Sequence, residues 1–108
     1  MKYMNMEKIT IKINHVALQE LCFALEIPHY PKTPEQKAVV SIMAELSKKL
    51  EKKEIDKRHT TKKFKMAFNY YEGFALERFC RDLYFGFTES NYLAHVALDI
   101  ANQIHKQL

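Results

Sequence analysis

The chain has 108 residues, about the size of one domain, and its 17 Lys and Arg against 13 Asp and Glu give a formal net charge of +4. A composition of 47% hydrophobic and 28% charged residues is typical of a folded globular protein and excludes disorder, collagen and coiled coils. No apolar run approaches the ~20 residues that span a bilayer, so we predict no contact with a membrane. Two cysteines and the polar residues 1–7 favour the cytoplasm.

The first predicted element is a strand over residues 8–14, where apolar and polar residues alternate. The apolar set is Ile9, Ile11 and Ile13, and the polar set is Thr10, Lys12 and Asn14. β-Branched residues favour this conformation, so we expect a half-buried strand with its polar set outward. A helical pattern follows over residues 15–27, with Asn14 placed to cap it.

A second helix is predicted to start at Thr33, because Pro34 suits the first helical position and Gln36 completes a capping box. Its apolar stripe fades in a charged stretch, and we place a linker over residues 54–61. Residues 48–65 hold nine Lys or Arg and only three acidic residues, so the positive charge of the chain is concentrated there. Such a stretch suits either a solvated linker or a surface that faces a polyanion.

Residues 62–70 fit two patterns. Phe64, Met66 and Phe68 alternate with polar residues as in a strand, but the same region also fits a helical face. A helix follows to about Gly86, and a last helix is predicted from residue 90 or 91 to the end of the chain.

An internal repeat favours the strand. With an offset of 55 residues, 8–14 aligns with 63–69, and with an offset of 58 residues, 17–25 aligns with 75–83 and places Cys22 on Cys80. This alignment needs three extra residues upstream of the helix in the second copy. The repeats cover approximately 8–53 and 62–108, and two strands from two copies would pair with each other.

We therefore predict a single, predominantly helical α+β domain over residues 1–108. A two-stranded ribbon would pack on four helices, with the two halves related by a pseudo-twofold axis. The alternative is an all-α four-helix bundle in which residues 62–84 form one long helix and residues 8–14 a loosely packed arm.

The strand–helix–helix order with an alternating strand resembles the ribbon-helix-helix family of DNA-binding proteins. The resemblance implies that outward side chains of the paired strands enter a DNA groove. These positions are Thr10, Lys12, Asn14, Lys63, Lys65 and Ala67. The first turn between helices, residues 26–33, is longer than the short turn with which that family grips phosphate.

Two hypotheses for function follow, and both describe a non-enzymatic binding protein, since no catalytic, cofactor or metal motif is found. The first is nucleic-acid binding through the ribbon and the basic stretch. Its candidate residues are Thr10, Lys12, Asn14, Lys57, Arg58, Lys62, Lys63 and Lys65. The second is a protein-interaction or self-association module that uses the aromatic second half, with Tyr70, Tyr71 and Tyr84 as candidates.

Overall fold

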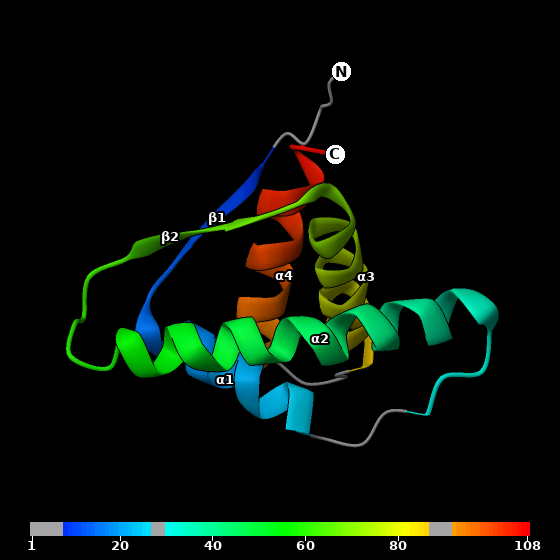
Figure 1. The fold of residues 1–108 in the computed structure, drawn as a ribbon, viewed down its shortest axis with the longest axis horizontal. Helices are drawn as coiled ribbons and strands as arrows, with labels where there is room; N and C mark the ends of the chain where they lie inside the picture. The colour runs from blue at the N-terminus through cyan, green and yellow to red at the C-terminus, as the bar shows by residue number, and fades with distance from the viewer. Residues whose placement is uncertain (1–7, 27–29, 87–91) are drawn as a thin grey trace.

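The computed structural model describes residues 8–26, 30–86 and 92–108, with the backbone alone for residues 83–86. It is a predominantly helical α+β fold with one two-stranded antiparallel sheet (Figure 1). The all-α alternative is therefore wrong, because residues 8–14 and 62–70 both contain a strand. The elements in chain order are β1 (Ile9–Ile13), α1 (His15–Glu26), α2 (Pro34–Asp56), β2 (Phe64–Phe68), α3 (Tyr70–Gly86) and α4 (Tyr92–His105).

The two strands pair in one defined register, with Ile11 directly opposite Met66. One face of this ribbon is buried against the helices, and its residues are Ile9, Ile11, Ile13, Phe64, Met66 and Phe68. Because successive side chains of a strand point to opposite faces, the other face is turned to solvent. The predicted alternation is thus confirmed in both strands.

The core lies between the ribbon and the four helices. The apolar stripes predicted for the helices supply it, including Leu18 and Leu21 of α1, Leu46 and Leu50 of α2, and Ile100 of α4. Burial of apolar area at about 25 cal/mol per Å² is the main favourable contribution to folding. Of the helices described, none is both long enough and apolar enough to cross a bilayer.

Helix caps explain where three of the helices begin. The Asn14 side chain accepts a hydrogen bond from the amide of Ala17, and the Asn69 side chain accepts one from the amide of Glu72. Thr33 and Gln36 form the predicted capping box at α2, with Pro34 in the first turn. Each cap satisfies an amide that the helix itself cannot pair.

The linker is shorter than expected. α2 continues to Asp56, so residues 54–56 of the predicted linker are helical, and residues 57–63 connect α2 to β2. The helix extends because Glu54 is buried and bonded to His15 and Arg58, which ties the last turn of α2 to α1.

The chain runs twice through strand, helix and helix, and the helices of the two halves are interleaved. α2 packs on α1 and also on α3, while α4 packs on α3 and also on α1. Both strand-to-helix junctions consist of one asparagine, Asn14 or Asn69, so no extra residues separate strand and helix in the second half. The alignment that places Cys22 on Cys80 needs three extra residues before the second helix, so it disagrees with the observed junctions. Counted from the start of each helix, Cys80 lies three residues further along α3 than Cys22 lies along α1.

Candidate nucleic-acid interface

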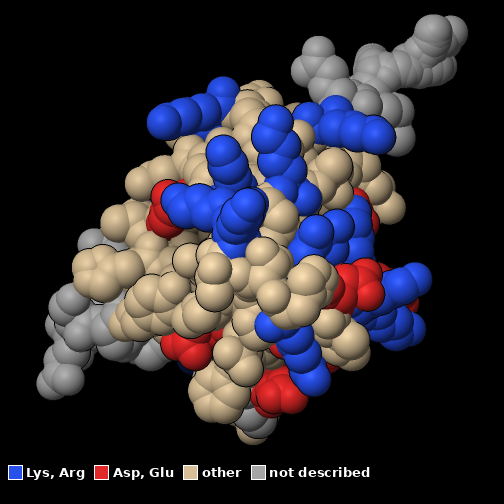
Figure 2. Space-filling view, turned by 90° about the vertical axis from the view of Figure 1, so that its left-hand side faces the viewer, with Lys and Arg blue, Asp and Glu red and all other residues tan. Residues whose placement is uncertain are grey.

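The solvent face of the ribbon is basic. It presents Thr10 and Lys12 from β1 and Lys65 and Ala67 from β2, and these four residues are called the ribbon face below. Exposed Lys8 and Lys63 extend it at the strand starts. Figure 2 shows lysine and arginine side chains gathered on this side of the molecule, with acidic side chains mainly toward its margins and lower half.

Lys12 and Lys65 lie directly opposite each other across the two strands. Like charges in directly opposite positions destabilise a sheet, because their side chains share one small surface. In the part of the chain that the structure describes, no carboxylate forms an ion pair with either lysine. Among the described residues, no ion pair therefore offsets this repulsion, and a bound anion would relieve it.

The outer edge of β1 is closed by two glutamines of the C-terminal segment. Gln107 accepts a hydrogen bond from the Thr10 amide at 2.9 Å and donates one to the Thr10 carbonyl oxygen at 2.6 Å. Gln103 does the same for Lys12, at 2.8 and 3.0 Å. The two side-chain amides replace a neighbouring strand and hold the ribbon rigidly on α4. No sequence pattern indicated this role.

Two of the predicted binding residues also have structural roles. The Asn14 side chain accepts the hydrogen bond that caps α1. The Arg58 guanidinium bonds both oxygens of Glu54, at 2.8 and 2.9 Å, through Nε and Nη2. The Arg58 side chain is 63% exposed, so its remaining N–H donors can still reach a ligand.

Three other predicted lysines lie near the ribbon but differ in surroundings. Lys62 and Lys63 are exposed in the connection that leads into β2. Lys57 ends α2 and is partly buried, with its ammonium 5.3 Å from the centre of the Phe64 ring. A cation over an aromatic face is held in place but keeps its charge.

Glu54 is the centre of a buried network below the ribbon. Its carboxylate is 2.6 Å from the Nε2 atom of His15 and is bonded by Arg58. The hydrogen bonds from Arg58 and His15 lower the pKa of Glu54 from 4.5 to about 2, despite burial. Glu54 thus stays ionised at neutral pH and pairs with Arg58, one cation of the basic stretch.

A row of lysines on α2 was missed by the sequence analysis. Lys49, Lys53 and Lys57 are spaced by four residues and so share one side of the helix. Lys49 donates a hydrogen bond to the carbonyl oxygen of Ala67 at 2.6 Å and lies 4.8 Å from the centre of the Phe68 ring. The i, i+4, i+8 spacing was the available signal, but the predicted linker began at residue 54, so Lys57 was not expected to share a helix with Lys49 and Lys53.

The aromatic candidates are only partly brought together. Tyr70 and Tyr71 are neighbours at the start of α3, and 52% and 58% of their surfaces are exposed. The side chain of Tyr84 lies outside the described residues. Two adjacent exposed tyrosines beside the Asn69 junction form a small patch close to the end of β2.

A cleft of about 210 Å³ flanks the ribbon on the side of α4. Lys12 and Lys63 contribute to its wall from the two strands, and Tyr92, His95 and Asp99 contribute from α4. Lysine, tyrosine and histidine side chains all suit contact with phosphate, while Asp99 is occupied by a hydrogen bond from Gln103 at 2.9 Å.

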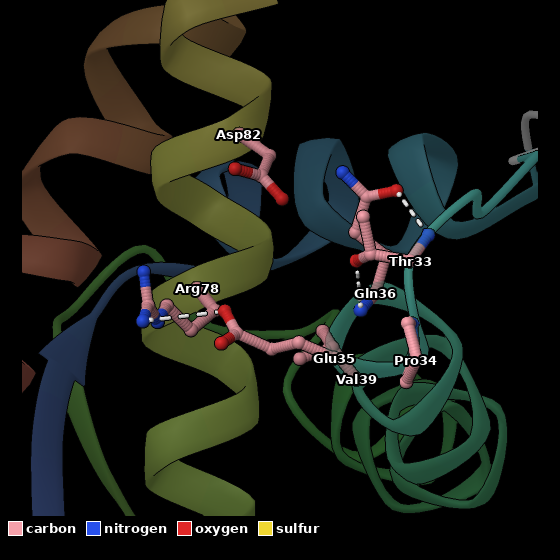
Figure 3. Close-up of a pocket in the computed structure, with 7 residues that line it drawn as sticks. All are labelled: Thr33, Pro34, Glu35, Gln36, Val39, Arg78 and Asp82. Atoms are coloured by element: carbon pink, nitrogen blue, oxygen red, sulfur yellow. Dashed lines mark hydrogen bonds and ion pairs between the residues drawn. The ribbon is translucent and has the colours of Figure 1, made fainter.

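A second cleft, of about 350 Å³, lies at the start of α2 (Figure 3). Four of its polar residues are paired among themselves, and Asp82 also lines it. Arg78 is 3.2 Å from the Glu35 carboxylate, and Thr33 and Gln36 bond each other's amides. Figure 1 shows this end of α2 far from the ribbon, so the turn with which the resembling family grips phosphate does not adjoin the ribbon face.

The two thiols are shielded. Cys80 is fully buried, and burial raises its pKa far above the ordinary value. Partial burial, aided by nearby Glu54, raises the pKa of Cys22 to about 11. Within the described ranges, no three His, Cys, Asp or Glu side chains gather as a metal site would require.

No protein-family model, curated protein or solved structure matches this chain. The resemblance to the ribbon-helix-helix arrangement therefore stands on the order of the elements, the antiparallel pairing of two strands and the basic outward face.

Proposed function

We propose that this chain is a non-enzymatic nucleic-acid-binding protein that contacts its ligand with the ribbon face. The observation that carries the proposal is the direct opposition of Lys12 and Lys65 on an exposed surface, where no carboxylate of the described residues forms an ion pair with either. A bound polyanion attracts both lysines and offsets the repulsion between them, so binding also removes an unfavourable interaction in the ribbon. The two free thiols fit a reducing compartment, and we propose the cytoplasm.

Duplex DNA suits the shape of the ribbon. A major groove about 12 Å wide admits a two-stranded antiparallel ribbon. Thr10, Lys12 and Lys65 then face the groove, where the Thr10 hydroxyl can contact base edges and the two ammonium groups can contact phosphates. Lys8 and Lys63 extend toward the phosphates at its walls.

We also propose that the two halves arose by duplication and form a covalent pseudo-dimer. In the alignment with offset 55, Ile11 corresponds to Met66, and these residues are paired at the centre of the ribbon. A twofold axis through that pair would exchange the strands. This arrangement supports the ribbon-helix-helix interpretation, in which two equivalent strands form the DNA-contacting ribbon.

Fluorescence anisotropy with a labelled mixed-sequence duplex, at about 50 to 300 mM salt, tests the proposal. Each lost phosphate contact reduces the slope of log K against log salt by about 0.9. Lys12→Gln/Lys65→Gln should therefore reduce the slope by nearly two. The matched control, Lys32→Gln/Lys37→Gln, removes the same charge at the other end of α2 and should bind like the parent. Equal losses in both variants, or no binding at low salt, would refute the proposal.

Protein binding through Tyr70 and Tyr71 remains a second candidate, and their joint exposure favours it. Tyrosine is enriched among residues that dominate protein interfaces. Association through this patch should tolerate salt and be lost in Tyr70→Ala/Tyr71→Ala, whereas binding through the ribbon face should weaken with salt and survive that substitution.

A further inference from the structure

The outer edge of β2 carries backbone groups that no other described strand pairs with. The amides and carbonyls of Thr10 and Lys12 point away from β2 toward Gln107 and Gln103. In an antiparallel pair, the residues opposite them also point outward. Those residues are Ala67 and Lys65. Within the part of the chain that the structure describes, the donor on this edge is Lys49, which bonds the carbonyl oxygen of Ala67.

The two edges of the ribbon therefore differ in the hydrogen bonding of their backbone groups. Gln103 and Gln107 fill the β1 edge with two acceptors and two donors, as a neighbouring strand would. On the β2 edge, no described residue bonds the amides of Lys65 and Ala67 or the carbonyl of Lys65. An open strand edge is a template for pairing with another chain.

Lysines surround this open edge. Lys49 and Lys57 lie over the rings of Phe68 and Phe64, at opposite ends of β2, and Lys53 lies between them on the same row of α2. The row thus runs along the strand. Lys65 and Lys63 add positive charge on the solvent face of the ribbon.

We propose that the β2 edge binds an acidic peptide segment of a partner protein as a third, extended strand. A peptide backbone supplies both the acceptors that the amides need and the donor that the Lys65 carbonyl needs. A nucleic-acid phosphate supplies acceptors only. A second copy of this chain would bring another lysine-rich edge against the first, and this repulsion disfavours it. Acidic side chains on the added strand would instead meet the α2 row and Lys65.

The test uses a fluorescein-labelled eight-residue peptide in which Glu alternates with Val. A second peptide has the same sequence and charge, but its alternate amides are N-methylated so that one edge cannot donate hydrogen bonds. The protein variant is Ala67→Pro, because proline removes an outward amide and blocks the edge without touching the β1–β2 hydrogen bonds. Lys32→Gln/Lys37→Gln is again the charge control.

We expect the unmodified peptide to bind. The affinity of the N-methylated peptide should be lower by a factor of about ten or more. Ala67→Pro should weaken binding by a similar factor, while the charge control should not. Equal binding of the two peptides, or no binding of either, would overturn the proposal. A duplex that loses affinity on Ala67→Pro, with no peptide binding, would assign the edge to nucleic acid and also overturn it. If circular dichroism shows that Ala67→Pro is unfolded, the comparison of the two peptides decides.

Discussion

Ile11 and Met66 lie directly opposite each other at the centre of the ribbon, although 55 positions separate them in the sequence. The same offset relates Asn14 to Asn69, and both asparagines cap the helix that follows their strand. The residues paired at the centre of the ribbon and the two capping residues are thus related by the same offset of 55 residues. This relationship is the basis of the proposed pseudo-dimer.

Equivalent caps should contribute equally to stability. Asn14→Ala and Asn69→Ala should each lower the free energy of unfolding by about 1 kcal/mol, because each substitution leaves one amide at the helix start without its hydrogen-bond acceptor. Urea unfolding followed by circular dichroism measures both. Asn102→Ala, on the exposed side of α4, is the control. If one cap variant has no effect while the other does, the two junctions are not equivalent.

Gly73 allows α3 to lie close to β1. A Cβ atom at this position would come within 2.6 Å of Ile9 Cδ1. Gly73→Ala should therefore destabilise the protein by about 1–3 kcal/mol through overpacking, which outweighs a gain of about 1 kcal/mol in helix propensity.

The double-mutant cycle with Ile9→Val isolates this contact, since valine lacks the Cδ1 atom. In the Ile9→Val background, Gly73→Ala should cost much less, and the difference is the coupling between the two sites. The same cost in both backgrounds would show that another neighbour limits the space at residue 73.

The low pKa of Glu54 predicts that the free energy of unfolding depends on pH in the acidic range. Its pKa is about 2 in the folded protein, against 4.5 for an unperturbed carboxyl. The ionised form therefore stabilises the fold fully above pH 4.5, and this contribution is lost as the pH falls toward 2.

Glu54→Gln should be less stable than the parent at pH 7, and the difference should shrink between about pH 4.5 and 2. Urea midpoints over this range measure it. Glu45→Gln, at an exposed position whose ion pair with Lys48 spans 3.9 Å, should match the parent throughout. A Glu54→Gln deficit that is independent of pH would mean that the carboxylate charge is not what stabilises the fold.

The glutamine contacts along β1 can be tested with an isosteric change. Gln107→Glu replaces the donor that bonds the Thr10 carbonyl with an acceptor and should cost about 1 kcal/mol. Gln19→Glu, exposed on α1, makes the same chemical change without a backbone contact. Chemical denaturation of the two variants should therefore differ, and equal stability would show that the clamp contributes nothing.

Local patterns were sufficient to predict the first strand, the four helices and the Asn14 and Thr33 caps, because alternation and capping depend on near neighbours in the sequence. The strand within residues 62–70 could not be told from a helix by its local pattern, and the internal repeat favoured it. The ribbon face followed from the same alternation. The roles of Glu54 and Gln103 could not be predicted, since each depends on a residue 39 or 91 positions away. The pairing of Arg58 with Glu54 lies four residues away on the same helix and was open to prediction, whereas the contact between Glu54 and His15 was not.

The most direct test of the central claim is to locate the bound ligand by NMR. Amide chemical shifts of the ¹⁵N-labelled chain would be recorded while a mixed-sequence DNA duplex is added at low salt. The proposed function predicts that the largest changes fall on Thr10, Lys12 and Lys65, with little change at Phe23 on the exposed side of α1. Changes centred on Tyr70 and Tyr71, or no changes at all, would contradict nucleic-acid binding by the ribbon face.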